Sequence, residues 1–185
     1  PFTRGRLVSV TDRASKSVTH YDGRCRVVRA ARRVNAPDGT ETKQWFCKTI
    51  NYDGANRPSR ESTGASAGSS VDTEYTRRGA VASVFYGDST LVTSVKRDPD
   101  GLVTEIAYGD GAKTTTAFDY DDLRRLRNLT TYRQTLENAP AETGQMLLQD
   151  EQYTYDRVGN PVEIRDWRIA TEWGPGFKPV TRKMR

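Results

Sequence analysis

The stretch Tyr155-Asp156-Arg157-Val158-Gly159-Asn160-Pro161-Val162-Glu163-Ile164 decides the fold, because it is the clearest copy of a pattern that recurs along the chain. The pattern consists of an aromatic-Asp pair, a short turn and an apolar strand. Further copies begin at Tyr21-Asp22, Tyr52-Asp53 and Tyr120-Asp121, and looser ones at Tyr75-Thr76, Asp98-Pro99 and Pro1-Phe2. A repeat on this scale specifies the architecture before any single residue is interpreted.

One position of the pattern, which we name the turn slot, sets the period. It is occupied by Gly5, Cys25, Asn56, Gly79, Gly101, Arg124 and Gly159. The basic unit of 20 to 23 residues is interrupted twice, near residues 34–43 and 136–145. Both insertions are rich in Pro, Gly or Asn, which favours longer loops within a single repeat segment spanning residues 1–185.

The residue types at the turn slot predict its conformation. Gly and Asn tolerate a positive φ, so the slot is expected to lie in a tight turn. The Asp that follows each Tyr suits the entry of this turn, because its carboxylate accepts hydrogen bonds from nearby backbone N–H groups. The motif residues that we expect to build the turns are Tyr21, Asp22, Tyr52, Asp53, Gly79, Gly101, Tyr120, Asp121, Tyr155, Asp156 and Gly159.

The stretches between slots are typical of strands. Val84-Phe85-Tyr86-Gly87-Asp88 aligns with Ile106-Ala107-Tyr108-Gly109-Asp110, and Gly-Asp between β-prone runs indicates a hairpin. We therefore predict strands over residues 80–86, 90–96, 102–108 and 113–120. Each repeat is then one hairpin, and the fold class is an all-β antiparallel meander.

Two columns of apolar residues accompany the repeat. One lies five places after the slot (Val10, Ala30, Val84, Ile106, Leu129 and Ile164), and the other lies two places after it (Leu7, Val27, Val81, Val103 and Leu126). Because the two columns differ by three residues, a straight strand would place them on opposite faces. Either the earlier column belongs to the turn, or both faces are partly buried.

The composition is typical of a wide, thin sheet. Hydrophobic residues make up 35% of the chain, charged residues 29%, and the mean hydropathy is -0.78. This is too polar for a deep core, although the length would suffice for one. No apolar run approaches membrane-spanning length and no signal peptide is recognisable. Starting at Pro1 and stopping where another Tyr-Asp is due, the chain is expected to be an excerpt of a longer array.

The Tyr-Asp-x-x-Gly-(Arg/Asn)-apolar repeats, in phase over nearly the whole chain, resemble those of the RHS or YD-repeat family. The resemblance implies a long β-sheet strip that coils into a hollow shell. In bacterial members, including the B and C components of Tc insecticidal toxin complexes, the shell encloses a toxic C-terminal polypeptide; in the animal teneurins it belongs to an adhesion protein. The closing stretch from Arg165 to Val180 is most similar to the Tc-type proteins.

The resemblance also implies the partners and the location. The partners would be further repeats of the same or another chain, the enclosed C-terminal polypeptide and a delivery subunit. A secreted or cell-surface protein without a cofactor is expected. A polar face would hold an unfolded passenger without offering it a hydrophobic grip.

Candidate catalytic and metal-binding residues are few. His20 is the only histidine, and no Gly-x-Ser-x-Gly motif accompanies it, so an ordinary strand residue is the simpler interpretation. Cys25 and Cys47 are too few for a zinc site. Their spacing of 22 residues permits a disulfide between adjacent strands, although two separate thiols are the preferred interpretation.

Two acidic stretches are candidate sites. Asp98-Pro99-Asp100-Gly101-Leu102 matches part of the signature at which RHS proteins cut themselves, but it lies in register with the repeats, so we interpret it as a turn. Asp119, Asp121 and Asp122 could serve acid-base chemistry or bind calcium. Neighbouring Arg124, Arg125 and Arg127 favour a solvated, neutralised turn instead. The small-residue run at 64–70 lacks the ending of a phosphate-binding loop.

The net charge of +5 raises the question of a polyanionic partner. Arg24, Arg26, Arg29, Arg32 and Arg33 form the densest basic stretch, but arginines recur in all repeats and are balanced by 24 acidic residues. Nucleic acid is therefore disfavoured, and a cell-surface glycan is preferred to it. Asn128-Leu129-Thr130 has the form of a glycosylation sequon.

The sequence thus predicts a non-enzymatic segment of a toxin-enclosing shell. The alternative is an extracellular adhesion or carbohydrate-binding module built on the same sheet. An exposed patch of Tyr86, Tyr108, Tyr132, Trp167 and Trp173 would favour the binding module. Aromatic residues that fill contacts between strands would favour the shell.

Overall fold

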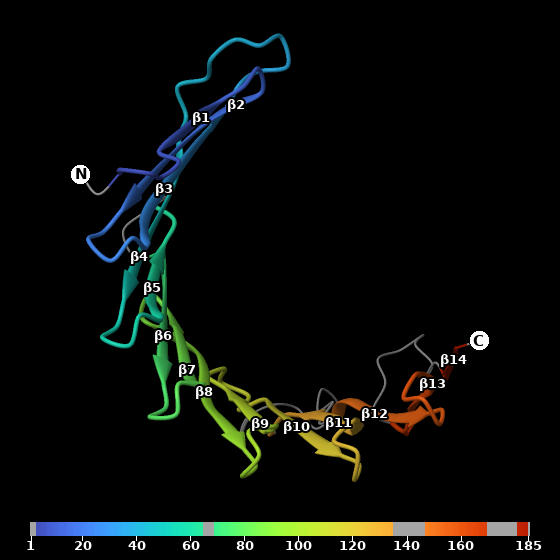
Figure 1. Cartoon of the computed structure of the whole chain (residues 1–185). Helices are drawn as coiled ribbons and strands as arrows, with labels where there is room; N and C mark the ends of the chain where they lie inside the picture. The colour runs from blue at the N-terminus through green and yellow to red at the C-terminus, as the bar shows by residue number, and fades with distance from the viewer. Residues whose placement is uncertain (1–2, 65–68, 135–146, 170–180, 185) are drawn as a thin grey trace. The chain divides into compact units, whose positions relative to one another are not determined.

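The computed structural model describes residues 3–64, 69–134, 147–169 and 181–184, and the regular structure in these ranges is entirely β (Figure 1). The strands are β1 (Ser9–Thr11), β2 (Ser15–Tyr21), β3 (Val27–Val34), β4 (Phe46–Tyr52), β5 (Pro58–Ser62), β6 (Ser70–Tyr75), β7 (Val81–Tyr86), β8 (Ser89–Arg97), β9 (Val103–Tyr108), β10 (Thr115–Tyr120), β11 (Leu126–Tyr132), β12 (Leu147–Tyr155), β13 (Pro161–Asp166) and β14 (Arg182–Lys183).

The strands follow one another in chain order through a 14-stranded sheet, and neighbouring strands run antiparallel. The predicted all-β meander of hairpins is therefore confirmed. The four strands predicted between residues 80 and 120 correspond to β7, β8, β9 and β10. Their bounds differ by one or two residues, because the ladder hydrogen bonds extend β8 to both sides and begin β10 only after the turn at Asp110.

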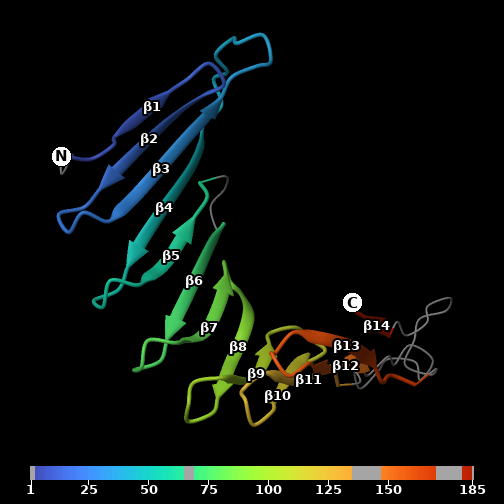
Figure 2. The same cartoon turned by 45° about the vertical axis from the view of Figure 1, so that its right-hand side comes forward.

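The chain divides into two compact units, which are described separately. Unit 1 comprises Pro1–Gly79 and Val84–Ser89, and unit 2 comprises Ala80–Ser83 and Thr90–Arg185. In Figure 2, β1 to β6 of unit 1 lie side by side in chain order. The expected loop near residues 34–43 connects β3 to β4 and contains a turn in which Ala36 N–H donates to Thr40 O at 2.9 Å. The second expected loop, near 136–145, lies outside the described residues.

A β-bulge recurs at one place in the repeat. In the β2–β3 ladder Tyr21 pairs with Val27 and His20 pairs with Arg29, which leaves Val28 without a partner. The same shift leaves one extra residue, three places after the slot, in four further hairpins: Ser59, Thr104, Arg127 and Val162. A bulge inserts one residue into one strand only, so it reverses the alternation of faces beyond it.

The bulge explains the odd spacing of the two apolar columns. Tyr21 and Thr19 lie two residues apart on β2 and so share a face, and their partners are Val27 and Ala30. The two columns therefore lie on one face of the sheet. Neither alternative derived from the sequence was complete, because both assumed a straight strand.

The two faces of unit 2 differ in chemistry. On one face, Phe118 pairs with Leu129, and Ile106 pairs with both Val95 and Thr116. On the other, cross-strand ion pairs join Lys96 to Glu105 at 2.8 Å and Arg127 to Asp119 at 2.6 Å. We name these the apolar face and the charged face.

Neither unit has a hydrophobic core. Among the described residues no apolar side chain is buried, and the buried residues are Ser15, Ser70, Ser83 and Thr116. The stability of the sheet must therefore come from its ladders, its cross-strand pairs and the contacts between successive turns.

Candidate functional site

The turn that opens each repeat is held by its aspartate. Asp22 Oδ1 accepts hydrogen bonds from the backbone N–H groups of Arg24 and Arg26, both at 2.9 Å. The backbone closes the turn through Cys25 N–H to Asp22 O and Asp22 N–H to Arg26 O, each at 3.0 Å. This is a type I turn followed by a left-handed residue, a standard way to connect two antiparallel strands.

The same turn recurs at every described copy that has an aspartate. The carboxylates that accept backbone N–H groups in this way belong to Asp22, Asp53, Asp98, Asp121 and Asp156. All seven turn slots have a positive φ, between 64° at Arg124 and 94° at Gly159. Cys25, Asn56 and Arg124 adopt this conformation although they carry a side chain, which costs energy that Gly would not require.

Hydrogen bonds to the turn carboxylates change their acidity. The Arg26 backbone N–H and the Arg26 guanidinium lower the pKa of Asp22, and Arg57 does the same for Asp53. The side chain of Arg125 and its backbone N–H lower the pKa of Asp121. These carboxylates are therefore stabilised as anions, which is the opposite of what a general acid requires.

Four of the turns are also joined to the next repeat through an arginine and a tyrosine. The guanidinium of Arg26 lies 4.4 Å from the ring centroid of Tyr52, which belongs to the following repeat. The Tyr52 hydroxyl donates in return to Val27 O at 2.9 Å, two places after the slot of the preceding repeat. We name this paired contact the Arg-Tyr interlock.

The interlock repeats along the chain. The guanidiniums of Arg6, Arg57 and Arg125 lie over the rings of Tyr21, Tyr75 and Tyr155 at 5.2, 4.4 and 4.6 Å. The hydroxyls of these tyrosines donate to Leu7 O, Pro58 O and Leu126 O at 3.0, 2.7 and 2.8 Å. The accepting carbonyl always lies two places after a slot, so one geometry joins these four pairs of consecutive repeats.

The repeat that lacks a tyrosine preserves half of the interlock. Arg97 stands where the other copies have Tyr, immediately before Asp98, and its Nη1 donates to Val81 O at 2.9 Å. Val81 again lies two places after a slot. An arginine thus replaces the tyrosine hydroxyl as the donor to the neighbouring hairpin.

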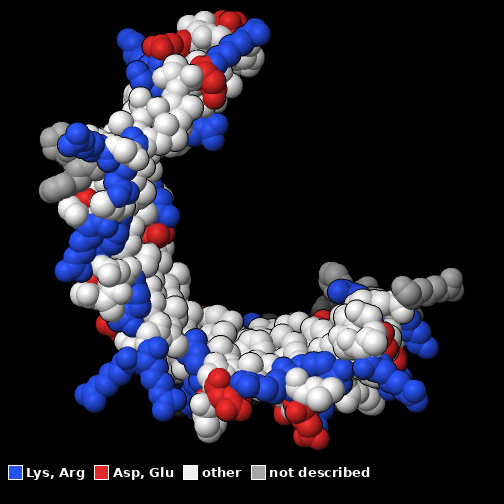
Figure 3. Space-filling model, in the orientation of Figure 1, with Lys and Arg blue, Asp and Glu red and all other residues white. Residues whose placement is uncertain are grey.

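The turns of consecutive hairpins form a row that we name the turn edge. In unit 1, Arg24 and Arg26 both donate to Asn56 Oδ1, at 3.0 and 2.8 Å, and Arg57 donates to Thr76 O at 3.4 Å. Figure 3 shows charged side chains gathered where the turns lie, basic in unit 1 and mixed with acidic side chains in unit 2.

The structure does not bring the histidine and the cysteines together as a reactive site. His20 is exposed on β2, where it pairs with Arg29 in the ladder. Cys25 is exposed in a turn slot, whereas Cys47 lies on β4 beside Arg29, and the two thiols are separate. The preferred sequence interpretation, two separate thiols in strand positions, agrees for Cys47, whereas Cys25 lies in the turn between β2 and β3.

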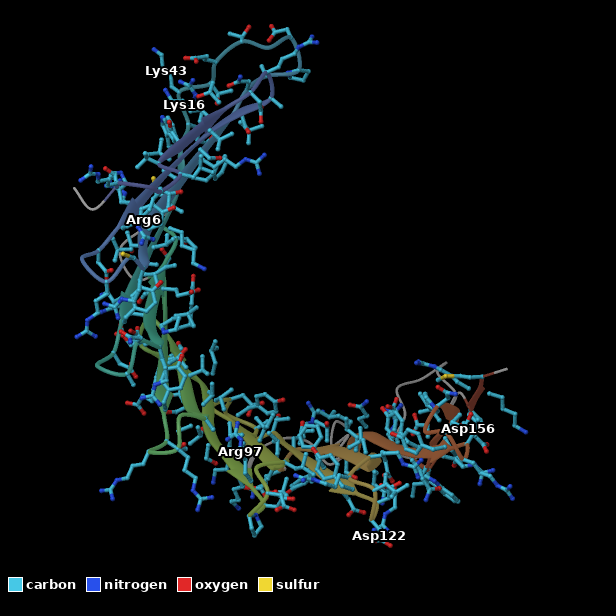
Figure 4. The ribbon with its side chains drawn as sticks, viewed as in Figure 1. Arg6, Lys16, Lys43, Arg97, Asp122 and Asp156 are labelled. Carbon is cyan, nitrogen blue, oxygen red and sulfur yellow. The ribbon has the colours of Figure 1, made fainter. Side chains whose placement is uncertain are left out.

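The acidic stretches are neutralised or engaged in turns. Asp119 accepts from Arg127 at 2.6 Å and from Asn128 at 3.3 Å, whereas Asp121 is held by Arg125. Figure 4 places Asp122 at the tip of the β10–β11 turn. Within the part of the chain that the structure describes, no three His, Cys, Asp or Glu residues lie close enough together to hold a metal ion. Asp98 accepts from Leu102 N–H at 2.8 Å as a turn residue.

A groove of about 740 Å³ lies on the apolar face of unit 2. Its apolar wall includes Leu91, Tyr108, Phe118 and Leu129, with threonine hydroxyls between them. Gly109 lies at its end, where an added Cβ would collide with the Thr90 carbonyl oxygen, so only glycine fits. A shallow surface of this kind can accept a chain, but it offers no convergent set of reactive groups.

Among the nominated aromatic residues that are described in unit 2, Tyr108 and Tyr132 lie on opposite faces of the sheet. Tyr108 lines the groove on the apolar face, whereas Tyr132 pairs with Thr115 in the row that belongs to the charged face. Trp167 is 51% exposed beside Arg165. Trp173, the loop residues 65–68 and most of the closing stretch lie outside the described residues.

Sequence reasoning missed the Arg-Tyr interlock. The signal was present, because an arginine directly follows the slot at Arg6, Arg26, Arg57 and Arg125. Each of these repeats is followed by one whose first residue is tyrosine. The pairing could not be read from the spacing alone, because the two residues meet only when neighbouring hairpins lie side by side.

No family model matches the chain, and no curated protein matches it. Solved structures do match. A Tc holotoxin pore from Photorhabdus luminescens, with a substitution in its TccC3 component, aligns at a TM-score of 0.72 and 16% identity over 88% of this chain. A TcdB2-TccC3 complex and a TcdB2-TccC3-Cdc42 complex align over the same share at TM-scores of 0.71 and 0.70, also at 16% identity.

The aligned region is a small part of those proteins. The chain spans 8% of the length of each matched chain. Within the described ranges, the structure contains no helix long and apolar enough to cross a membrane. The chain therefore has the fold of a segment of these Tc toxin proteins: an open, antiparallel all-β sheet of repeated hairpins.

Proposed function

We propose that this chain is a non-catalytic segment of an RHS/YD-repeat shell, which encloses a C-terminal toxic polypeptide in a secreted bacterial toxin. The observation that carries the proposal is the Arg-Tyr interlock. It joins consecutive repeats at four places along the chain through one repeated contact, so the sheet can be extended by further repeats without a central core.

The sheet chemistry supports a wall in preference to a catalyst. Backbone polar groups are satisfied strand by strand, and the turn carboxylates are held as anions by their own turns. An open array exposes unpaired strand edges, which associate unless something covers them. Further repeats of the same or a partner chain are the natural covering, and a delivery subunit would contact the completed shell.

The similarity in fold to the TcdB2-TccC3 structures supports the kind of assembly that we propose. In such an assembly this segment would supply a stretch of wall, and the C-terminal polypeptide would be enclosed by many repeats together. The charged face and the apolar face provide two different linings. A charged lining would keep an unfolded passenger from adhering, because it offers little apolar surface for burial.

Limited proteolysis with mass spectrometry on the full-length protein that contains these repeats tests the proposal. A C-terminal segment that survives until the repeats themselves are cut supports an enclosed passenger. The double variant Arg125→Gln/Tyr155→Leu should loosen the wall and advance the digestion of that segment. The matched variant Tyr132→Leu, outside any interlock, should leave its timing unchanged. Immediate digestion of the segment in the unaltered protein would refute enclosure.

The alternative is an extracellular adhesion or carbohydrate-binding module. The observation in its favour is the exposure of single aromatic residues, such as Tyr86 at 49% and Trp167 at 51%. Within unit 2, Tyr108 and Tyr132 lie on opposite faces of the sheet, which favours the shell, since sugar sites gather aromatic side chains around one ligand. Saturable binding of a neutral glycan array that is lost on Trp167→Ala would support the module.

A further inference from the structure

The two units carry very different charge. Unit 1 contains 15 Lys and Arg against 9 Asp and Glu, a net charge of +6, whereas unit 2 contains 14 against 15, a net charge of -1. The positive charge of the chain therefore resides in unit 1, and unit 2 contributes none of it. A field of one sign confined to one part of a protein attracts a partner of the opposite sign.

Much of this charge lies on the turn edge of unit 1. Four successive turns contribute basic residues to it: Arg4, Arg6, Arg24, Arg26, Arg57, Arg77 and Arg78. Its acidic residues are Asp22 and Asp53, and each is already ion-paired within its own turn, to Arg26 and to Arg57, at 2.6 Å. The remaining guanidiniums have no carboxylate partner among the described residues.

The free guanidiniums are accessible. Arg4, Arg24, Arg77 and Arg78 are exposed. Arg24 donates only to the Asn56 side chain, which leaves most of its five N–H groups open. Arginine presents these donors in a planar fork that matches an oxyanion in two places at once.

The row is regular because the turns are attached to one another. Arg6 donates to Cys25 O at 3.1 Å, Arg24 and Arg26 donate to Asn56, and Arg57 donates to Thr76 O. Two strands separate consecutive turns, so the turns recur about every 10 Å along the edge. That distance is close to the length of a disaccharide in an extended polysaccharide.

The aromatic residues of this edge each have one ring face occupied by an arginine. The rings of Tyr21, Tyr52 and Tyr75 are covered by Arg6, Arg26 and Arg57, and their hydroxyls are bound to backbone carbonyls. Binding of single-stranded nucleic acid depends on exposed aromatic platforms for its bases. A polyanion without bases fits this edge better.

We infer that the turn edge of unit 1 is a binding surface for a linear sulfated polysaccharide, with Arg4, Arg24, Arg77 and Arg78 contacting its sulfate groups. The surface lies at the ends of the hairpins, so it leaves both faces of the sheet free. It is independent of enclosure by the shell: either role could fail without affecting the other.

Heparin is the probe that tests this inference on the 185-residue chain. The triple variant Arg24→Gln/Arg77→Gln/Arg78→Gln removes three charges from the turn edge. A matched variant, Arg13→Gln/Lys16→Gln/Lys43→Gln, removes three charges elsewhere in unit 1, and both lower the net charge from +5 to +2. Figure 4 shows Lys16 and Lys43 toward the other end of the strands from Arg6.

The turn-edge variant should bind heparin at least about tenfold more weakly than the parent, since three exposed ion pairs are lost, and the matched variant less than about threefold. Arg77→Gln/Arg78→Gln alone should weaken binding without disturbing the fold, because both side chains are exposed and neither makes a hydrogen bond or ion pair within the described residues. Its circular dichroism spectrum and melting temperature verify that the fold is retained.

Three results would overturn the inference. Equal losses in the two triple variants would mean that only net charge matters. Heparin binding is measured at 150 mM salt, which is near physiological ionic strength. If the parent chain does not bind heparin there, sulfated polysaccharides are excluded as the ligand. Tighter binding of single-stranded DNA than of heparin, lost in the same turn-edge variant, would assign the surface to nucleic acid.

Discussion

We expect the hydroxyl and the ring of each tyrosine in the Arg-Tyr interlock to contribute separately to the free energy of unfolding. At the copy formed by Arg125 and Tyr155, the hydroxyl donates to Leu126 O at 2.8 Å and the ring lies 4.6 Å from the guanidinium. Tyr155→Phe removes only the hydrogen bond and should lower the free energy of unfolding by about 1 kcal/mol. In a chain of this length that corresponds to a melting temperature lower by about 2–4 °C.

Removing the ring should cost more. Tyr155→Leu also abolishes the cation-π contact and should lower the free energy of unfolding by about a further 0.5–1 kcal/mol. Arg125 has two further roles, because it pairs with Asp121 at 2.7 Å and donates to Asp156 O at 3.4 Å, so its single variant reports all three contacts. A double-mutant cycle between Tyr155→Leu and Arg125→Gln isolates the ring contact, with an expected coupling of about 0.5–1 kcal/mol.

Urea unfolding monitored by circular dichroism provides these free energies, and amide hydrogen exchange in β11 and β13 shows whether the loss is local. Tyr132, on β11 but outside any turn, supplies the control: Tyr132→Phe should change stability by less than about 0.5 kcal/mol. If Tyr155→Phe is no more destabilising than Tyr132→Phe, or if the cycle shows no coupling, the interlock does not hold the repeats together.

Three other predictions follow from the turns. Arg97→Tyr should leave the unfolding free energy within about 0.5 kcal/mol, since either residue can donate to the carbonyl on β7, whereas Arg97→Ala should lower it by about 1–2 kcal/mol; thermal melting distinguishes them. Gly109→Ala should destabilise the chain by at least about 1 kcal/mol more than Gly111→Ala, because only the former places a Cβ against the Thr90 carbonyl, and equal melting temperatures would contradict this. The lowered pKa of Asp53 means that its contribution to stability is complete above its unfolded pKa near 3.8 and is lost as the pH falls through the folded value. A urea titration between pH 6 and pH 2 should therefore show a decline that is smaller in Asp53→Asn, and identical profiles would exclude this role.

The sequence was a reliable guide wherever a feature depends on neighbours along the chain. The Asp22 carboxylate stabilises its turn by accepting hydrogen bonds from the backbone N–H groups two and four residues later. The turn could therefore be predicted from the residue types alone. The left-handed slot was equally readable from its glycines, even though Arg124 adopts it at a φ of 64°. The strands and their meander order followed, because short hairpins connect adjacent antiparallel strands.

The sequence alone therefore determined the repeat, its turns and the class of fold. The tertiary structure decided which face each column occupies and how one repeat is joined to the next. The bulge at Val28 brings Val27 and Ala30 onto one face, and it exists only when β2 and β3 pair. The contact of Arg26 with Tyr52 spans two strands that meet only in the sheet. Hydrogen bonds between residues close in sequence can be predicted from the spacing of those residues. Strand register and the stacking of side chains depend on which strand lies alongside.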